Sequence, residues 1–257
     1  MLYCKSQGGN VEYKLMSGHS KWSQIKRSKG AADIKKGQTF TKISNAITIA
    51  VKEGGGVADP NQNFKLRLAT EAARAANMPK ENVERAIKRA AGVGSEVKLE
   101  TVEYEGFAPS GVSVIVEAIT DNPNRTLNVV KNAFSKAGGH LATPGAVSYQ
   151  FKTLGEIRIN KNSETTLDEI LNIATQADAS DVEEEEGEFV IFTEPQDLSK
   201  VREKLTNSGL KIEEAGLFKK ANVKMPVDPQ KLESVVDFLG RLEELDDVHK
   251  VYSNLMI

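Results

Sequence analysis

The segments ETVEYEGF, residues 100–107, and GVSVIVEAI, residues 111–119, decide the fold class. The first segment holds Thr, Val, Tyr and Phe, the second holds three valines and two isoleucines, and a Pro-Ser-Gly turn lies between them, so the pattern predicts two successive strands. Asn122-Pro123 follows, and an N-cap residue with proline at the first helical position predicts that a helix begins there. Because the order strand, strand, helix, strand recurs farther along, the sequence predicts an α+β fold after residue 94.

The strand and helix signals after residue 94 fall into two groups. The last predicted helix and strand complete the sheet that begins near residue 100, which makes the segment between them an insertion. We therefore predict two small α+β domains of the ferredoxin-like type, one inserted in the other. The first comprises residues 95–151 and 217–257, and the inserted domain comprises residues 152–216.

Residues 16–94 predict an all-helical domain, because apolar residues recur at three- and four-residue steps in three segments. The first helix carries Phe40, Ile43, Ile47 and Val51 and ends at Gly54-Gly55-Gly56. Asp59-Pro60 predicts the start of the second helix, whose apolar stripe is Phe64, Leu68, Ala72 and Ala75. Pro79 opens the third helix, over Val83, Ile87 and Ala90. Residues 1–15 have no periodicity, and we expect a disordered extension there.

The net charge of −2 hides a strong asymmetry along the chain. Residues 16–92, hereafter the basic head, hold 15 Lys and Arg against 6 Asp and Glu, a net charge of +9. Residues 93–257, hereafter the acidic body, hold 17 against 29, a net charge of −12. Two regions of opposite charge are expected to meet different partners.

The sequence predicts a cytoplasmic protein with no membrane partner. A single cysteine, Cys4, forms no internal disulfide, which fits a reducing compartment. The first residues contain no apolar core of a secretory signal, and no stretch approaches the roughly 20 apolar residues of a spanning helix.

No catalytic arrangement emerges from the sequence. The three histidines, His19, His140 and His249, are far apart and show no metal-ligand spacing. A nucleophile elbow, a Walker loop and a dinucleotide-binding glycine motif are all missing. The acidic run 183–186 predicts a solvated strand face, because alternate residues point to opposite sides. We therefore expect no enzyme, metal, cofactor or small-molecule substrate.

The basic head favours nucleic acid as its partner. Residues 17–32 contain no acidic residue, whereas a merely solvated surface mixes both signs. Lysine and arginine at this density suit a polyanion, because phosphate contacts release counterions. Arg85, Lys88 and Arg89 form a further basic face. We expect nucleic-acid contacts from His19, Lys21, Trp22, Lys26, Arg27, Lys29, Lys35, Lys36, Lys42, Arg67 and Arg74.

Trp22 has two alternative roles in the stretch GHSKW, residues 18–22. The indole either packs into the helical core or stacks on a base, where stacking contributes roughly 1–3 kcal/mol. The two roles are compatible if Trp22 packs and anchors a basic arm.

Three stretches resemble the YebC/PmpR family. They are GHSKWSQIKRSKGAADIKKGQTFTKI, NFKLRLATEAARAANMPKENVERAIKRAAG and EGFAPSGV, and the resemblance extends over residues 16–257. It implies a helical head followed by two α+β domains, the third domain being inserted in the second. Arg27 and Gly30 stand where family members often have histidine and alanine.

The resemblance also implies a function in gene expression, with two alternatives for the bound polymer. Bacterial members are described as DNA-binding transcriptional regulators. Others, including mitochondrial ones, are translational activators that associate with ribosomes and assist synthesis through proline-rich stretches. The partner is therefore DNA, or ribosomal or transfer RNA on the ribosome.

Overall fold

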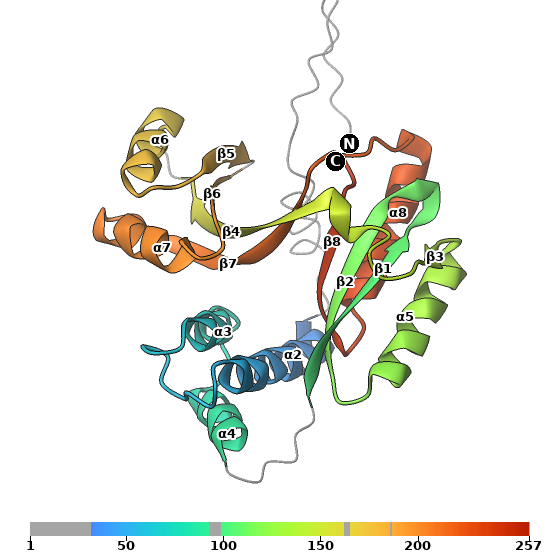
Figure 1. Cartoon of the computed structure of the whole chain (residues 1–257), viewed down its shortest axis with the longest axis horizontal. Helices are drawn as coiled ribbons and strands as arrows, with labels where there is room; N and C mark the ends of the chain where they lie inside the picture. Colours follow the sequence, from blue (N-terminus) through green and yellow to red (C-terminus); the bar gives the residue numbers. More distant parts are fainter. Residues whose placement is uncertain (1–31, 93–98, 162–164, 186, 257) are drawn as a thin grey trace, which may run out of the picture.

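The computed structural model describes residues 32–92, 99–161, 165–185 and 187–256, with side chains from residue 37 onward (Figure 1). It has an N-terminal helical region followed by two antiparallel four-stranded sheets with helices. The predicted α+β fold class is thereby confirmed. The expected extension, residues 1–15, lies outside the described residues.

The helical region consists of α2 (Ala32–Glu53), α3 (Phe64–Ala75) and α4 (Lys80–Ala91). The longest of them, α2, packs against both others. Its predicted apolar stripe enters the core of the head, where Ile47 and Val51 are fully buried beside Leu66 of α3 and Ala86 of α4. Burial of this stripe accounts for the assembly of the head, since the apolar area removed from water drives the packing.

The predicted start of the second helix at Asp59-Pro60 is wrong, because these residues form a turn. The helix begins at Phe64, and the side chain of Asn63 accepts a hydrogen bond from the amide of Leu66 at 3.1 Å. The Asn63 amide group also donates to the carbonyl of Ala50, at 2.8 Å. A buried asparagine with both contacts is the stronger cap, because it also ties the turn to α2.

The first sheet has the strand order β3-β1-β2-β8, from β1 (Glu100–Phe107), β2 (Ser113–Thr120), β3 (His140–Leu141) and β8 (Val248–Ser253). A short 3-10 turn, Pro109–Gly111, joins the first two strands. Helices α5 (Pro123–Ala137) and α8 (Pro229–Glu243) cover one face and bury Phe134 and Phe238 edge to face, with 5.0 Å between the ring centroids. As predicted, Asn122 caps α5, accepting from the amide of Arg125.

The second sheet has the strand order β5-β6-β4-β7, from β4 (Phe151–Asn160), β5 (Asp181–Glu185), β6 (Glu188–Thr193) and β7 (Ile212–Ala221). Helices α6 (Leu167–Gln176) and α7 (Leu198–Asn207) cover one of its faces, over a core that includes Ile157, Phe189 and Ile191. Thr166 and Glu169 form a capping box at the start of α6. Strand β7 is continuous through residues 216–217, where the sequence pattern placed the end of the insertion.

The acidic run 183–186 is solvated only in part, which corrects the sequence prediction: Glu184 is exposed, Glu183 is half-buried and Glu185 is buried. Each of its described members has a cationic partner: Glu183 contacts Lys220 and Glu184 contacts Lys161. Glu185 is 4% exposed and accepts from the buried Arg158 at 3.0 Å. The reason is the strand order β5-β6-β4-β7, which brings basic side chains from β4, from the residue after β4 and from β7 to this run.

The side chain of Glu105, in β1 of the first sheet, binds the loop that leads into the second sheet. This carboxylate is 8% exposed and accepts hydrogen bonds from the backbone amides of Gly145, Val147 and Ser148, at 2.5–2.8 Å. Burial alone would raise its pKa, but the three amide bonds outweigh burial and hold the pKa of Glu105 below its usual value. The loop that leads into β4 is therefore fastened to β1.

Replacing Glu105 with glutamine should lower the free energy of unfolding by about 1.5–3 kcal/mol at pH 7, because an amide cannot serve all three donors. A depressed carboxyl pKa stabilises the fold above its unfolded value and loses that effect as pH falls through the folded pKa. The difference between wild type and Glu105→Gln should thus shrink below about pH 4. Urea unfolding at pH 7 and pH 3.5 measures it, and equal stability at pH 7 would refute this role.

Candidate nucleic-acid interface

Helix α2 joins the head to the acidic body. Ala46 and Ile49 lie on the side of α2 that packs against Leu99 and Ile119, outside the core of the head. The Lys52 ammonium donates to the carbonyl of Leu99 at 2.9 Å. One helix thus contributes to two apolar clusters and fixes where the basic surface stands relative to the body.

The N-terminal half of α2 also makes polar contacts with the end of α8 and the residues after it. The Lys42 ammonium donates to the carbonyl of Glu243 at 2.5 Å, and the Gln38 amide donates to Asp246 at 3.1 Å. These contacts orient the N-terminal half of α2 relative to the body.

Helix α3 fastens the head to the second sheet's domain. Its predicted inward stripe is wrong in part: Leu66 and Ala73 enter the core of the head, whereas Phe64 and Leu68 pack against the core beneath α6 and α7. A helix that packs against two domains needs apolar residues on two of its faces. The helical period shows which residues share a face, but it does not show which domain each face contacts.

Two arginines carry the polar part of this α3 contact. Arg67 is half-buried; its guanidinium donates to the Ser199 hydroxyl at 3.1 Å and lies 5.3 Å from the ring centroid of Phe64. Arg202 of α7 donates to Glu71 at 2.7 Å. A phosphate at Arg67 would have to replace contacts that hold two domains together.

The structure places the expected binding residues in three groups. His19, Lys21, Trp22, Lys26, Arg27 and Lys29 lie outside the described residues, as do the side chains of Lys35 and Lys36, whose backbone begins α2. Lys42 and Arg67 contact other domains. Arg74, at the last turn of α3, is exposed.

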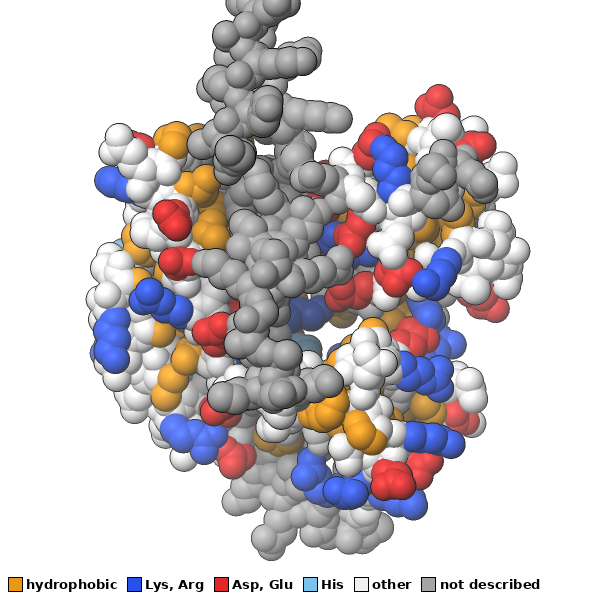
Figure 2. Space-filling model, turned by 180° about the vertical axis from the view of Figure 1, so that it is seen from behind, with side chains coloured by type: hydrophobic (Ala, Val, Ile, Leu, Met, Phe, Trp, Pro, Cys, Tyr) orange, Lys and Arg blue, Asp and Glu red, His pale blue; other side chains and the backbone are white. Residues whose placement is uncertain are grey.

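The exposed cations of the described head gather mainly on α4. Arg85, Lys88 and Arg89 are exposed, and Arg89 donates to the Ser44 hydroxyl at 3.3 Å. None of these three, nor Arg74, forms an ion pair with a described residue. Residues 37–92 hold nine Lys and Arg against five Asp and Glu. Figure 2 shows the result at its lower right, where blue side chains outnumber red ones on the head.

The two described histidines, His140 and His249, contribute little to this surface. Burial, with Lys250 and Lys42 nearby, lowers the pKa of His249 to about 4, which leaves the imidazole neutral at pH 7. His140 is exposed and its ring lies 5.3 Å from that of Phe107. Within the described ranges, no group of three or more histidine, cysteine, aspartate or glutamate residues is arranged to hold a metal ion.

The chain matches two family models that together cover most of its length. Residues 20–93 match the TACO1/YebC N-terminal domain, and residues 99–255 match the TACO1/YebC second and third domain. The chain belongs to the TACO1/YebC family.

Similar proteins span nearly the whole chain. A protein of Herpetosiphon aurantiacus named "probable transcriptional regulatory protein" is 46% identical over 94% of this chain and 95% of its own. One of the same name from Thermotoga maritima is 45% identical over 93% of both chains. The crystal structure of a conserved hypothetical protein from Aquifex aeolicus is similar with a TM-score of 0.83 and 40% identity, over 92% of this chain and 97% of that one. In the described part of this chain, no helix has the length and apolar character to cross a membrane.

Alanine substitutions at Arg67 and Arg74 should separate docking from binding. We expect Arg67→Ala to lower the free energy of unfolding by about 1 kcal/mol, because its hydrogen bond to Ser199 is lost. Arg74→Ala should change stability by less than about 0.5 kcal/mol. Instead, it should weaken nucleic-acid binding and reduce the salt slope by about one. Urea unfolding and anisotropy titrations test both, and an exchange of the two phenotypes would contradict this assignment.

Proposed function

We propose that this protein is a nucleic-acid-binding regulator of gene expression in the cytoplasm, and that it acts as a DNA-binding transcriptional regulator. The observation that carries the proposal is the separation of charge within one chain: a head of +9 mounted on a body of −12. The names of the relatives support the same class of function.

The proposed contact is electrostatic. Residues 17–32 bring Lys21, Lys26, Arg27 and Lys29 with no acid, and α4 presents Arg85 and Lys88. Cations of this density displace the counterions condensed on the phosphates, which gives affinity without sequence information. Binding should therefore weaken steeply as salt rises.

The acidic body restricts how the polymer lies. Like charges repel over about one Debye length, roughly 8–10 Å at physiological salt. A phosphate backbone is therefore held on the head and kept away from the acidic parts of the body. This arrangement sets an orientation, which a uniformly basic protein would not do.

Replacing Lys26, Arg27 and Lys29 together with alanine should abolish duplex DNA binding without unfolding the protein, because three phosphate partners are lost. Anisotropy of a labelled 30-bp duplex between 50 and 200 mM salt measures affinity, and circular dichroism checks the fold. A triple variant of exposed body cations, Lys211→Ala with Lys231→Ala and Arg241→Ala, serves as control. Unchanged affinity of the head variant for every nucleic acid tested would sink the proposal.

One observation favours a second candidate, a ribosome-associated translation factor that binds ribosomal or transfer RNA. An acidic body is repelled by duplex DNA, whereas on a ribosome it can face a basic ribosomal protein. Co-sedimentation with ribosomes at the two salt concentrations separates the candidates. Tight, salt-sensitive ribosome binding beside only micromolar DNA affinity would make the protein a translation factor, since non-specific DNA binding falls in that range.

A further inference from the structure

The acidic body contains one long stretch without any acidic residue. Residues 122–155 hold four cations, Arg125, Lys131, Lys136 and Lys152, and neither Asp nor Glu. The rest of the body holds 13 Lys and Arg against 29 Asp and Glu. Helix α5 lies entirely within this stretch, so it is a local exception to the charge of the body.

The outward side of α5 has a regular pattern. Asn124, Asn128, Asn132 and Lys136 recur every four residues and all four are exposed. Residues four apart lie one above another on a helix, so these side chains form one stripe. Leu127, 39% exposed, and Lys131 flank it on the adjacent row. We call these six residues the α5 stripe.

Helix stability does not explain the three asparagines. Asparagine is among the poorer helix formers, because its amide competes with the backbone for hydrogen bonds. None of the three is buried, and none makes a side-chain hydrogen bond with a described residue. Their amides, each with donors and an acceptor, are left to meet an external partner.

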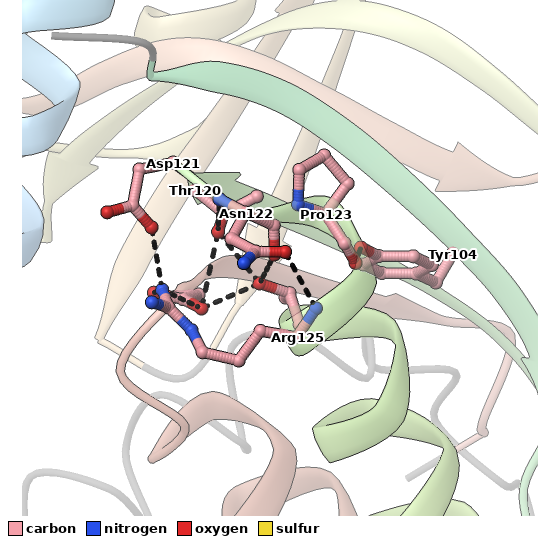
Figure 3. A network of polar contacts seen from close by, with 8 residues as sticks. Tyr104, Thr120, Asp121, Asn122, Pro123 and Arg125 are labelled. Carbon is pink, nitrogen blue, oxygen red and sulfur yellow. Dashed lines mark hydrogen bonds and ion pairs between the residues drawn. The ribbon is translucent and has the colours of Figure 1, made fainter.

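The start of α5 is held by a network of polar contacts, which Figure 3 shows. The Arg125 guanidinium pairs with Asp121 at 2.9 Å and with Asp247 at 3.1 Å. The Thr126 hydroxyl donates to Asp247 at 2.6 Å, and the Tyr104 hydroxyl donates to the carbonyl of Pro123 at 2.9 Å. These contacts connect the helix to β1, to the residue after β2 and to the residue before β8, which gives the stripe a fixed orientation.

The same contacts decide the charge along α5. Both nearby acids, Asp121 and Asp247, are paired with Arg125 at the first turn. Lys131 and Lys136, in the second half of the helix, are exposed and form no ion pair with any residue in the described ranges. Their charges are thus available to an anionic partner, about 7.5 Å apart along the helix axis.

We infer that α5 enters the major groove of duplex DNA, where its stripe reads base pairs. This inference rests on the proposed function and supplies it with an element that reads sequence. The major groove is about 12 Å wide and admits an α-helix, and asparagine pairs with N6 and N7 of adenine. Leu127 is placed to contact a thymine methyl group, while Lys131 and Lys136 contact phosphates.

The position of α5 fits this role. In Figure 1 it lies along the outer side of the body, over β1 and β3 at one end of the first sheet. A helix recessed among other elements could not reach the edges of the bases. The deep, narrow major groove of RNA excludes side chains, which is why the stripe favours DNA.

The test compares two pairs of substitutions in the full chain with a matched control. Wild-type protein first selects a preferred sequence from a pool of random 30-bp duplexes. Anisotropy then measures its affinity for the selected duplex and for a scrambled duplex of equal composition. Asn128→Ala with Asn132→Ala should lose the preference by roughly fivefold or more per asparagine and leave the affinity for the scrambled duplex unchanged. Lys131→Ala with Lys136→Ala should weaken binding to both duplexes and reduce the salt slope by about two.

The control variant carries Lys231→Ala and Arg241→Ala, two exposed cations of α8. It should bind both duplexes as wild type does. A wild-type protein without sequence preference, or α5 variants that match the control, would overturn the inference; α5 would then serve a protein partner or none. The proposed function fails separately, if the Lys26, Arg27 and Lys29 variant still binds DNA.

Discussion

The structure depends on the burial of helix α2 on two sides. Ile47 and Val51 enter the core of the head, while Ala46 and Ile49 cover Leu99 and Ile119 of the body. Fully burying one such side chain contributes about 1.5–3 kcal/mol, so both contacts together are hard to break. Since the head and the body share this helix, the orientation of every basic side chain on α4 follows from it.

Two further contacts hold the head and the two sheets in one fixed arrangement. Helix α3 docks Phe64 and Leu68 on the second sheet's domain, and Glu105 ties the loop before β4 to the first sheet. Opposite charges can therefore be kept apart at fixed positions: cations on α4, acids over much of the body. Helix α5 is the exception in the body, because it contains no acidic residue. Its fixed position allows it to contact a nucleic acid that the head already binds.

Structural features that depend on local sequence patterns could be predicted from the sequence. Features that are set by contacts between residues far apart in the chain could not. The caps at Asn122 and Thr166 were predictable, because each uses side chains within three residues. The start of α3 was not predictable, because Asn63 acts as the cap through a hydrogen bond to the carbonyl of Ala50, thirteen residues away. Arg67 belongs to a basic pattern, yet Ser199, more than a hundred residues away, gives it a contact that no local pattern contains. The stripe on α5 could not be identified from the sequence alone, because the burial of Phe134 is what shows which side of the helix faces outward.

Hydrogen–deuterium exchange of the full chain, with and without a 30-bp DNA duplex at low salt, tests the central claim most directly. We predict slower exchange in the segment before α2, in α4 and along α5, with no change in β5 and β6, for which no contact with nucleic acid is proposed. Exchange that is unchanged in the head, or slowed only on the second sheet, would contradict the claim that the basic head holds nucleic acid.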